Sequence, residues 1–207
     1  MPDEQHSSRD INAAPLFDDP YAWFDSWFAQ ANATDMVDPN AMTLATADTT
    51  GQPTVRVVLL KEWDERGFVF YTNLLSTKGQ AMEHNPRVGL NFFWRDLGRQ
   101  IRIEGRTEPV SDQQADAYFQ SRPRGSRIGA WASDQSQPLK SRDALMKRQE
   151  LIAEKYEGKV IPRPPHWSGR RVVPHLFEFW EAGDFRLHNR WEFRRDDGAW
   201  TIDRLNP

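Results

Sequence analysis

The chain of 207 residues contains no cysteine. This absence excludes disulfide scaffolds, cysteine-ligated zinc, iron–sulfur clusters and cysteine nucleophiles, and it is compatible with a reducing cytosol. No apolar run approaches the ~18 residues that a membrane-spanning helix requires, and the polar first ten residues show no secretory signal. We therefore expect a cytoplasmic protein without a membrane partner.

Several common catalytic motifs are also missing. The sequence has no phosphate-binding loop of the P-loop type and no G-x-G-x-x-G after a predicted strand. It has no H-E-x-x-H and no G-x-S-x-G motif. The five histidines are far apart and show no local spacing of metal ligands, so we expect no metal site. Simple metalloenzyme and hydrolase hypotheses therefore lose most of their support.

Basic residues are scarce at the N-terminal end. The first 55 positions hold nine acidic residues and one arginine, whereas the rest of the chain holds 26 basic and 21 acidic residues. A net charge of −3 therefore hides a mildly cationic body, which is compatible with an anionic small ligand or with nucleic acid. Nine Trp, twelve Phe and four Tyr are enough to build a substantial core in a chain of this length.

The N-terminal part predicts an arm followed by one helix. Residues 1–18 show no periodicity and are predicted to form a flexible arm. Asp19 is a suitable N-cap with Pro20 at the first helical position, and bulky aromatic residues follow at helical spacing. We expect an amphipathic helix that ends near Ala33.

Most of the remaining chain is predicted to be strand. Short runs rich in β-branched and aromatic residues recur about every dozen residues, which is typical of an antiparallel sheet or barrel. Capping serines predict two helices among them, from Ser111 to about Gln120 and from Ser141 to about Tyr156. The predicted strands are 42–47, 55–61, 68–72, 88–94, 101–106, 172–180, 185–195 and 199–205.

Three potentially cationic side chains alternate along one of these strands. Alternation places Arg186, His188 and Arg190 on the same face. Cations in one row repel each other unless an anion lies against them. Two interpretations stay open: a solvated face paired with carboxylates of a neighbouring strand, or the wall of an anion site in which His188 takes part in proton- or hydride-linked chemistry.

Two further groups of basic residues are informative. The segment 121–127 follows the helix that holds Tyr118 and combines three arginines, two serines and a Gly-Ser turn, which suits a phosphate. A basic surface loop is the commoner alternative, and RNA binding is a third. Arg56 and Lys61 bracket an apolar run, and strict alternation would place them on opposite faces. Either a bulge intervenes there or each contacts a different group.

Six short segments form an ordered set from about residue 39 to the end of the chain. They are Val57–Lys61, Gly67–Asn73, Ser121–Ser126, Gly129–Ser133, Glu178–Trp180 and Arg186–His188. In this order they resemble the pyridoxine (pyridoxamine) 5′-phosphate oxidase family, and Arg163–Trp167 and Asp203–Pro207 fit the same pattern.

The resemblance implies a mainly β fold with packed helices, a split β-barrel of the FMN-binding, Greek-key type, in a homodimer with FMN at the interface. It implies an N-terminal arm and helix over 1–38 and an FMN-binding domain over 39–207 that includes a C-terminal dimerisation region. The implied reaction is oxidation of pyridoxine or pyridoxamine 5′-phosphate to pyridoxal 5′-phosphate, with O₂ as acceptor and H₂O₂ as product. Nucleic acid is not an implied partner.

The resemblance also assigns site residues by position. Arg186 and His188 would contact the pyridine ring and its reacting C4′ substituent, and they are the candidate catalytic residues. Two ligands that each bear a phosphate explain the scattered cations better than one ligand would. The resemblance assigns binding of the substrate phosphate to Lys61, Tyr118, Arg122 and Ser126. It assigns binding of FMN to Arg56, Tyr71, Thr72, Lys78, Gln100, Gln135, Ser136, Trp180 and Arg190.

The sequence departs from the family pattern at a few positions. Thr77 stands where an arginine that would contact the FMN phosphate is common, and Asn189 stands where an acid is usual. Two alternatives to the oxidase follow. One is another flavin oxidoreductase on the same barrel, such as a phenazine-pathway oxidase, and the other is a non-catalytic FMN- or pyridoxal-phosphate-binding protein.

Overall fold

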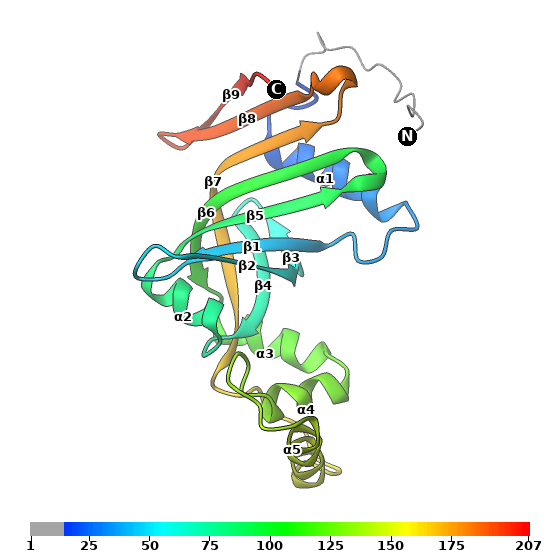
Figure 1. Cartoon of the computed structure of the whole chain (residues 1–207), viewed down its shortest axis with the longest axis vertical. Helices are drawn as coiled ribbons and strands as arrows, with labels where there is room; N and C mark the ends of the chain where they lie inside the picture. Colours follow the sequence, from blue (N-terminus) through cyan, green and yellow to red (C-terminus); the bar gives the residue numbers. More distant parts are fainter. Residues whose placement is uncertain (1–14) are drawn as a thin grey trace.

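A computed structural model of the chain describes residues 15–207. Most of the arm predicted over 1–18 lies outside these residues. The described strands form one sheet in the order β2-β1-β5-β6-β7-β4-β3, with β8 paired to β7 and β9 paired to β8 (Figure 1). The strands are β1 (Ala41–Ala47), β2 (Pro53–Leu59), β3 (Glu62–Asp64), β4 (Gly67–Asn73), β5 (Arg87–Trp94), β6 (Arg99–Pro109), β7 (Trp167–Glu181), β8 (Asn189–Asp196) and β9 (Ala199–Arg204).

The sheet is antiparallel throughout the described residues, as the strand spacing predicts. The long strands β6 and β7 shift register between Glu104 and Gly105, where a bulge bends the ladder. A Cβ on Gly105 would lie 2.4 Å from the carbonyl oxygen of Val173, so the close approach of the two strands requires glycine there. The expected mainly β, split-barrel fold is confirmed.

Helices pack on this sheet and on one another. They are α1 (Pro20–Asn32), α2 (Thr77–His84), α3 (Asp112–Ser121), α4 (Arg124–Ala132) and α5 (Arg142–Lys155), and single 3₁₀ turns occur at Arg95–Leu97 and Asp184–Arg186. In the described part of the chain, no helix combines the length and the apolarity that a membrane crossing requires.

Helix α1 matches its prediction and closes the main core. The Asp19 carboxylate accepts hydrogen bonds from the backbone N–H groups of the first turn at 3.1 and 3.3 Å, and Pro20 begins the helix. Trp23 stacks on Phe179 of β7 with ring centroids 4.6 Å apart. Phe24 meets Phe68 of β4 edge-on at 4.8 Å. The aromatic face of the helix is thereby buried against the sheet.

A second, smaller core fixes α3 and α4 against β7. It consists of Phe119, Ile128, Ile161 and Trp167, with Tyr71 and Tyr118 packed against it. Because α3 and α4 are held there, the segment between them has a defined position beside β4.

The predicted loop at 121–127 is wrong. Ser121 is the last residue of α3 and Arg124 is the first residue of α4, so only Arg122 and Pro123 are irregular. The two short elements α2 and β3 have no counterpart in the sequence prediction. The capping box at Ser111 is only half formed: its hydroxyl accepts from the backbone N–H of Gln114, but the Gln114 side chain donates to Glu62 instead.

The predicted strand over 185–195 is wrong at its start. Asp184–Arg186 forms a 3₁₀ turn, and β8 begins only at Asn189. Phe185 and Arg186 have φ values of 53° and 66°, which no strand contains. Arg186 and His188 therefore precede the strand that holds Arg190, and simple alternation does not place the three on one face.

Candidate functional site

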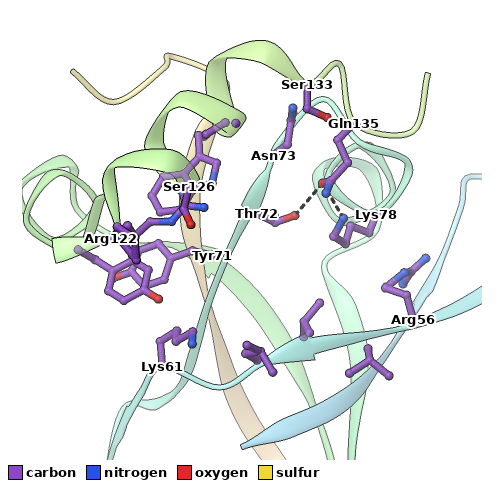
Figure 2. Close-up of a pocket in the computed structure, with 18 residues that line it drawn as sticks. Arg56, Lys61, Tyr71, Thr72, Asn73, Lys78, Arg122, Ser126, Ser133 and Gln135 are labelled. Atoms are coloured by element: carbon purple, nitrogen blue, oxygen red, sulfur yellow. Dashed lines mark hydrogen bonds between the residues drawn. The ribbon is translucent and has the colours of Figure 1, made fainter. Parts of the chain in front are cut away.

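A cavity of about 790 Å³ opens between the β2–β4 side of the barrel and helices α2, α3 and α4 (Figure 2). This volume is in the range of small-molecule sites, ~300–1,000 Å³. Four cationic side chains line the cavity, and no described lining residue is acidic. The predicted residues that line it are Arg56, Lys61, Tyr71, Thr72, Lys78, Tyr118, Arg122, Ser126 and Gln135.

Figure 2 shows Arg56 and Lys78 on one side of the cavity and Lys61 and Arg122 on the other. Arg56 lies on β2, and Lys61 lies two residues beyond the end of that strand. No bulge is needed to bring both into one cavity, because the strand ends before alternation would separate them. The cations thus form two groups, which we call the Arg56–Lys78 side and the Lys61–Arg122 side.

On the first side, Arg56 is held by neutral acceptors only. Its guanidinium donates to the Leu44 carbonyl oxygen at 3.0 Å and to the hydroxyls of Thr46 and Thr54 at 2.8 and 2.5 Å. No carboxylate of the described residues pairs with it, and burial lowers its pKa. These contacts fix the direction of a positive charge that has no counterion within the described protomer.

Lys78 completes this side from the first turn of α2. Its Nζ donates to Gln135 Oε1 at 2.9 Å and to Ser76 Oγ at 3.2 Å. Thr72 Oγ1 donates to the same Gln135 oxygen at 3.5 Å. Burial and then the charge of Arg56 lower the pKa of Lys78, so the two cations lie close enough to repel. An anion placed between them would relieve that repulsion.

On the second side, Arg122 has an unsatisfied donor. Its Nη1 is buried and makes no hydrogen bond within the described residues. The guanidinium lies over the ring of Trp167 at 4.7 Å and that of Phe119 at 5.6 Å, and burial lowers its pKa. A buried donor of a charged group without an acceptor costs about 1–3 kcal/mol or more, so this atom is suited to an anionic ligand.

An aromatic wall and a helix start complete the second side. Tyr71, Tyr118 and Trp167 stack in nearly parallel planes, with 3.9 Å between the two tyrosine centroids. Burial raises the pKa of Tyr118, so its hydroxyl is a neutral donor. Ser126 lies in the first turn of α4, which has no acidic residue and no side-chain cap. The N–H groups at this end favour negative charge.

The other predicted residues lie elsewhere. Ser136 follows Gln135 but does not line the cavity. Gln100, Trp180 and Arg190 are register partners across β6, β7 and β8, and they form one cross-strand row. Strand β8 and helix α4 lie toward opposite ends of the protomer in Figure 1. One protomer therefore brings nine of the predicted residues together and leaves a second cluster apart.

The candidate catalytic residues belong to this second cluster. Arg186 is exposed and makes no side-chain hydrogen bond within residues 15–207. The His188 ring lies 4.5 Å from the ring of Trp180, and its Nδ1 faces the Gly183 N–H at 3.3 Å. When Nδ1 accepts that hydrogen bond, a neutral ring has its proton on Nε2 and can donate from that atom.

Sequence reasoning missed several lining residues. Asn73 and Ser133 add polar groups to the wall, and Trp167 supplies its largest ring. Each is the last residue of a segment that fits the family resemblance, so the ends of these segments could have indicated them as site residues. The apolar residues Val57–Leu59 lie between the two cationic sides.

A second cavity, of about 460 Å³, has the opposite charge. Four acidic residues and one arginine line it, together with Tyr21, Trp63 and Trp200. A phosphate would be repelled there, which leaves the larger cavity as the candidate site. Within residues 15–207, no cluster of three or more metal-ligating side chains is present.

Comparisons with known proteins match both parts of the chain. Residues 29–156 match the family model described as pyridoxamine 5′-phosphate oxidase, and residues 167–207 match the model described as the pyridoxine 5′-phosphate oxidase C-terminal dimerisation region. A curated pyridoxine/pyridoxamine 5′-phosphate oxidase of Bordetella petrii is 56% identical over 189 residues, which cover 91% of this chain and 89% of that protein. The corresponding protein of Acaryochloris marina is 50% identical over 198 residues, with 96% and 88% covered.

Solved structures share the fold. PhzG from Burkholderia lata 383, in complex with tetrahydrophenazine-1-carboxylic acid, superposes with a TM-score of 0.88 at 31% identity, covering 95% of this chain and 96% of that one. A pyridoxamine 5′-phosphate oxidase-related, FMN-binding protein of Nostoc punctiforme gives a TM-score of 0.74 at 19% identity, covering 91% and 98%.

Proposed function

The chain belongs to the pyridoxine/pyridoxamine 5′-phosphate oxidase family, and from this membership we propose that it oxidises pyridoxine or pyridoxamine 5′-phosphate to pyridoxal 5′-phosphate. The proposed cofactor is FMN, the acceptor is O₂ and the second product is H₂O₂. The observation that supports this best is the pair of cationic sides in one cavity without a lining acid. Two phosphate-bearing ligands fit that arrangement. A cytoplasmic location stays a prediction.

The Arg56–Lys78 side fits the FMN phosphate. Its two cations have only neutral hydrogen-bond partners within the described residues, and their mutual repulsion favours an anion between them. Thr72 and Gln135 add polar groups to the same side. Two further FMN contacts that we propose are Tyr71, which belongs to the aromatic wall between the ligands, and Ser136. The chemistry that FMN supplies when bound is hydride acceptance from the substrate C4′ and reoxidation by O₂.

The Lys61–Arg122 side fits the substrate phosphate. The buried Nη1 of Arg122 lacks an acceptor, and Lys61 has no carboxylate partner within the described residues. Tyr118 and Ser126 supply hydroxyl donors. Phosphate binding at a distance from the reacting carbon would fix the pose of the substrate and exclude water from the cavity.

We further propose that the site is composite and that a homodimer assembles it. Gln100, Trp180 and Arg190 lie outside the cavity of their own protomer, and so do Arg186 and His188. Their strands belong largely to the region matched by the C-terminal dimerisation model. In this proposal each FMN-binding unit of residues 39–207 receives those five residues from its partner subunit, while the arm and helix of 1–38 remain a separate N-terminal segment.

Arg186 and His188 would then act at the pyridine ring. The exposed Arg186 guanidinium would stabilise the negative charge on the oxygen or nitrogen of the C4′ substituent as that atom loses its proton, while C4′ itself gives up a hydride. His188 would orient the ring by donating from Nε2, since the Gly183 N–H faces its Nδ1.

A second candidate is a flavin oxidase with a phenazine-type substrate, which the similarity to PhzG supports. A substrate with a carboxylate but no phosphate offers two acceptor oxygens and a single negative charge, so it would satisfy the donors of the Lys61–Arg122 side less fully than a phosphate does. The Lys61–Arg122 side therefore favours the phosphorylated substrate.

The test is aerobic turnover of pyridoxine 5′-phosphate by the purified protein with added FMN. Aldehyde and peroxide are measured together, and we expect equal amounts of both. FMN-loaded protein without turnover would favour the second candidate. Protein that fails to bind FMN would contradict the proposal.

A further inference from the structure

Glu178 is a buried carboxylate that the proposed function does not use. It lies on β7, two residues before Trp180, and its side chain is only 4% exposed. Its Oε1 accepts from Arg190 Nε at 2.8 Å. Its Oε2 accepts from Arg102 Nη2 at 2.6 Å and from Arg102 Nε at 3.1 Å. One carboxylate thus joins arginines from the two strands that flank β7.

The position of Glu178 relates it to the FMN contacts. The row Gln100, Trp180 and Arg190 is followed, two residues along each strand, by the row Arg102, Glu178 and Glu192. Residues two apart on a strand share a face, so both rows lie on the same side of the sheet. Glu178 is the diagonal neighbour of Arg190, within reach of its guanidinium.

Arg190 is oriented by two acceptors within its own chain. Besides the bond to Glu178, its Nη1 donates to the Asn206 carbonyl oxygen at 2.8 Å. The backbone N–H of Leu205 donates to the Arg190 carbonyl oxygen at 3.0 Å and holds the C-terminal residues beside β8. The remaining nitrogen, Nη2, makes no hydrogen bond within residues 15–207. Two fixed donors therefore determine where the third nitrogen points.

The charges around Glu178 indicate that its ion pair with Arg190 is not incidental. Glu192 lies directly opposite Glu178 across β7 and β8 and is also buried, so two carboxylates repel across that pair. Arg102 stands 3.7 Å from Glu192 and screens the repulsion. Although burial raises it, the hydrogen bonds from Arg190 and Arg102 lower the pKa of Glu178 overall and keep it ionised.

We propose that Glu178 is a positioning residue: its carboxylate orients the Arg190 guanidinium so that Nη2 faces the bound FMN of the partner subunit's site. The inference rests on the proposed function, since it assumes that Arg190 contacts FMN. A structural role alone would predict lower stability after loss of Glu178, but no energetic coupling to Arg190 in FMN binding.

The test compares FMN dissociation constants, measured by quenching of flavin fluorescence, for Glu178→Gln, Arg190→Lys and the double variant. We expect Glu178→Gln to weaken FMN binding by roughly tenfold, and the double variant to be within about twofold of Arg190→Lys. Glu104→Gln is the matched control. Glu104 also pairs with Arg102, but it is 42% exposed and does not contact Arg190. The FMN affinity of the Glu104→Gln variant should therefore stay within about twofold of wild type.

The outcomes are distinguishable. If wild type binds FMN and Glu178→Gln binds it equally well, or if the two losses multiply in the double variant, the inference is overturned and the proposed function stands. Wild type that does not bind FMN overturns both. If Glu178→Gln does not fold, Glu178→Asp replaces it, because the shorter side chain keeps the charge. Glu178→Asp should bind FMN more weakly than wild type. In the Arg190→Lys background, the same substitution should cause no further loss of FMN affinity. Independent losses there would overturn the inference.

Discussion

Lys78 and Arg56 reach the same side of the cavity from α2 and β2, and burial together with the charge of Arg56 lowers the pKa of Lys78. Folding therefore places two like charges near each other without a carboxylate from the described residues to separate them. Such an arrangement destabilises the ligand-free protein and favours an anionic ligand. This opposition between stability and binding can be measured.

Lys78→Met should separate the two effects. We expect the FMN-free variant to be more stable than wild type, by about 0.5 kcal/mol after solvent screening, and to bind FMN at least ~10-fold more weakly. Urea unfolding and FMN titration measure these quantities. Because the folded-state pKa of Lys78 lies below the ordinary 10.5, the stability difference should be present at neutral pH and disappear as pH rises through 10.5. Exposed Lys140→Met is the control and should change neither quantity.

Arg122→Gln should impair binding of the substrate phosphate. The lost charged hydrogen bonds correspond to roughly 1.5–3 kcal/mol, or a KM about 10- to 150-fold higher for pyridoxine 5′-phosphate. Affinity for FMN should change little, since Arg122 lies on the other side of the cavity. Arg124→Gln is the control, because within residues 15–207 the Arg124 side chain donates only to the Tyr156 and Lys159 carbonyl oxygens. Equal KM values for the two variants would contradict the assignment.

Thr77→Arg should strengthen FMN binding. Thr77 is exposed in the first turn of α2, beside Lys78, and a guanidinium there would add a third cation to the Arg56–Lys78 side. We expect a dissociation constant about 3- to 10-fold lower. Stability without FMN should fall, because a cation at a helix N-terminus opposes the helix dipole. Thr77→Gln is the uncharged control, and an equal gain in that variant would show that charge is not the cause.

Tyr21→Phe should stabilise the protein. The Tyr21 hydroxyl is buried and has no hydrogen-bond partner within residues 15–207, so its removal should add about 1 kcal/mol at pH 8. Burial raises the pKa of Tyr21 to about 12 from 10.0. Since the fold favours the neutral form, wild type should also lose stability as pH rises from 10 to 12, by about 1 kcal/mol after screening. Unfolding curves at pH 8 and pH 11 measure the two effects, and parallel pH dependence of both proteins would contradict the second.

The sequence predicts elements whose signal is local. Helix α1 shows an N-cap at Asp19, a proline at N1 and aromatic residues at helical spacing, and its bounds follow directly. Helix α2 has an N-cap serine, Ser76, but it is short and polar and shows no apolar periodicity. Gly79 in it lowers helix propensity, yet a Cβ there would lie 2.2 Å from the Leu74 carbonyl oxygen. The close approach of the turn that precedes the helix, and not helix propensity, requires glycine at that position.

The site is predictable as a set of residues but not as an arrangement. Phe185 is 94% exposed and has a positive φ, which is unfavourable for a residue with a bulky side chain. Alternation of apolar and polar residues in the sequence does not reveal such a backbone conformation. The strand prediction therefore placed Arg186 and His188 in line with Arg190. The pairing of Arg190 with Glu178 agrees with the interpretation of a cationic face balanced by carboxylates of a neighbouring strand, whereas Arg186 has no such partner among the described residues.

Mixing two inactive variants should restore activity if the site is composite. Arg122→Ala removes a residue of the cavity, and Arg186→Ala removes one of the second cluster while leaving FMN bound. With substrate below the wild-type KM, each homodimer should be nearly inactive, because both of its sites contain the defect. After subunit exchange, half of the dimers are mixed, and each mixed dimer has one intact site, so about a quarter of wild-type turnover should return. If both residues served a site within one protomer, every site would still contain a defect and no activity would return. A mixture of Arg122→Ala with Lys61→Ala is the control, because these residues line the same cavity and must fail to complement each other.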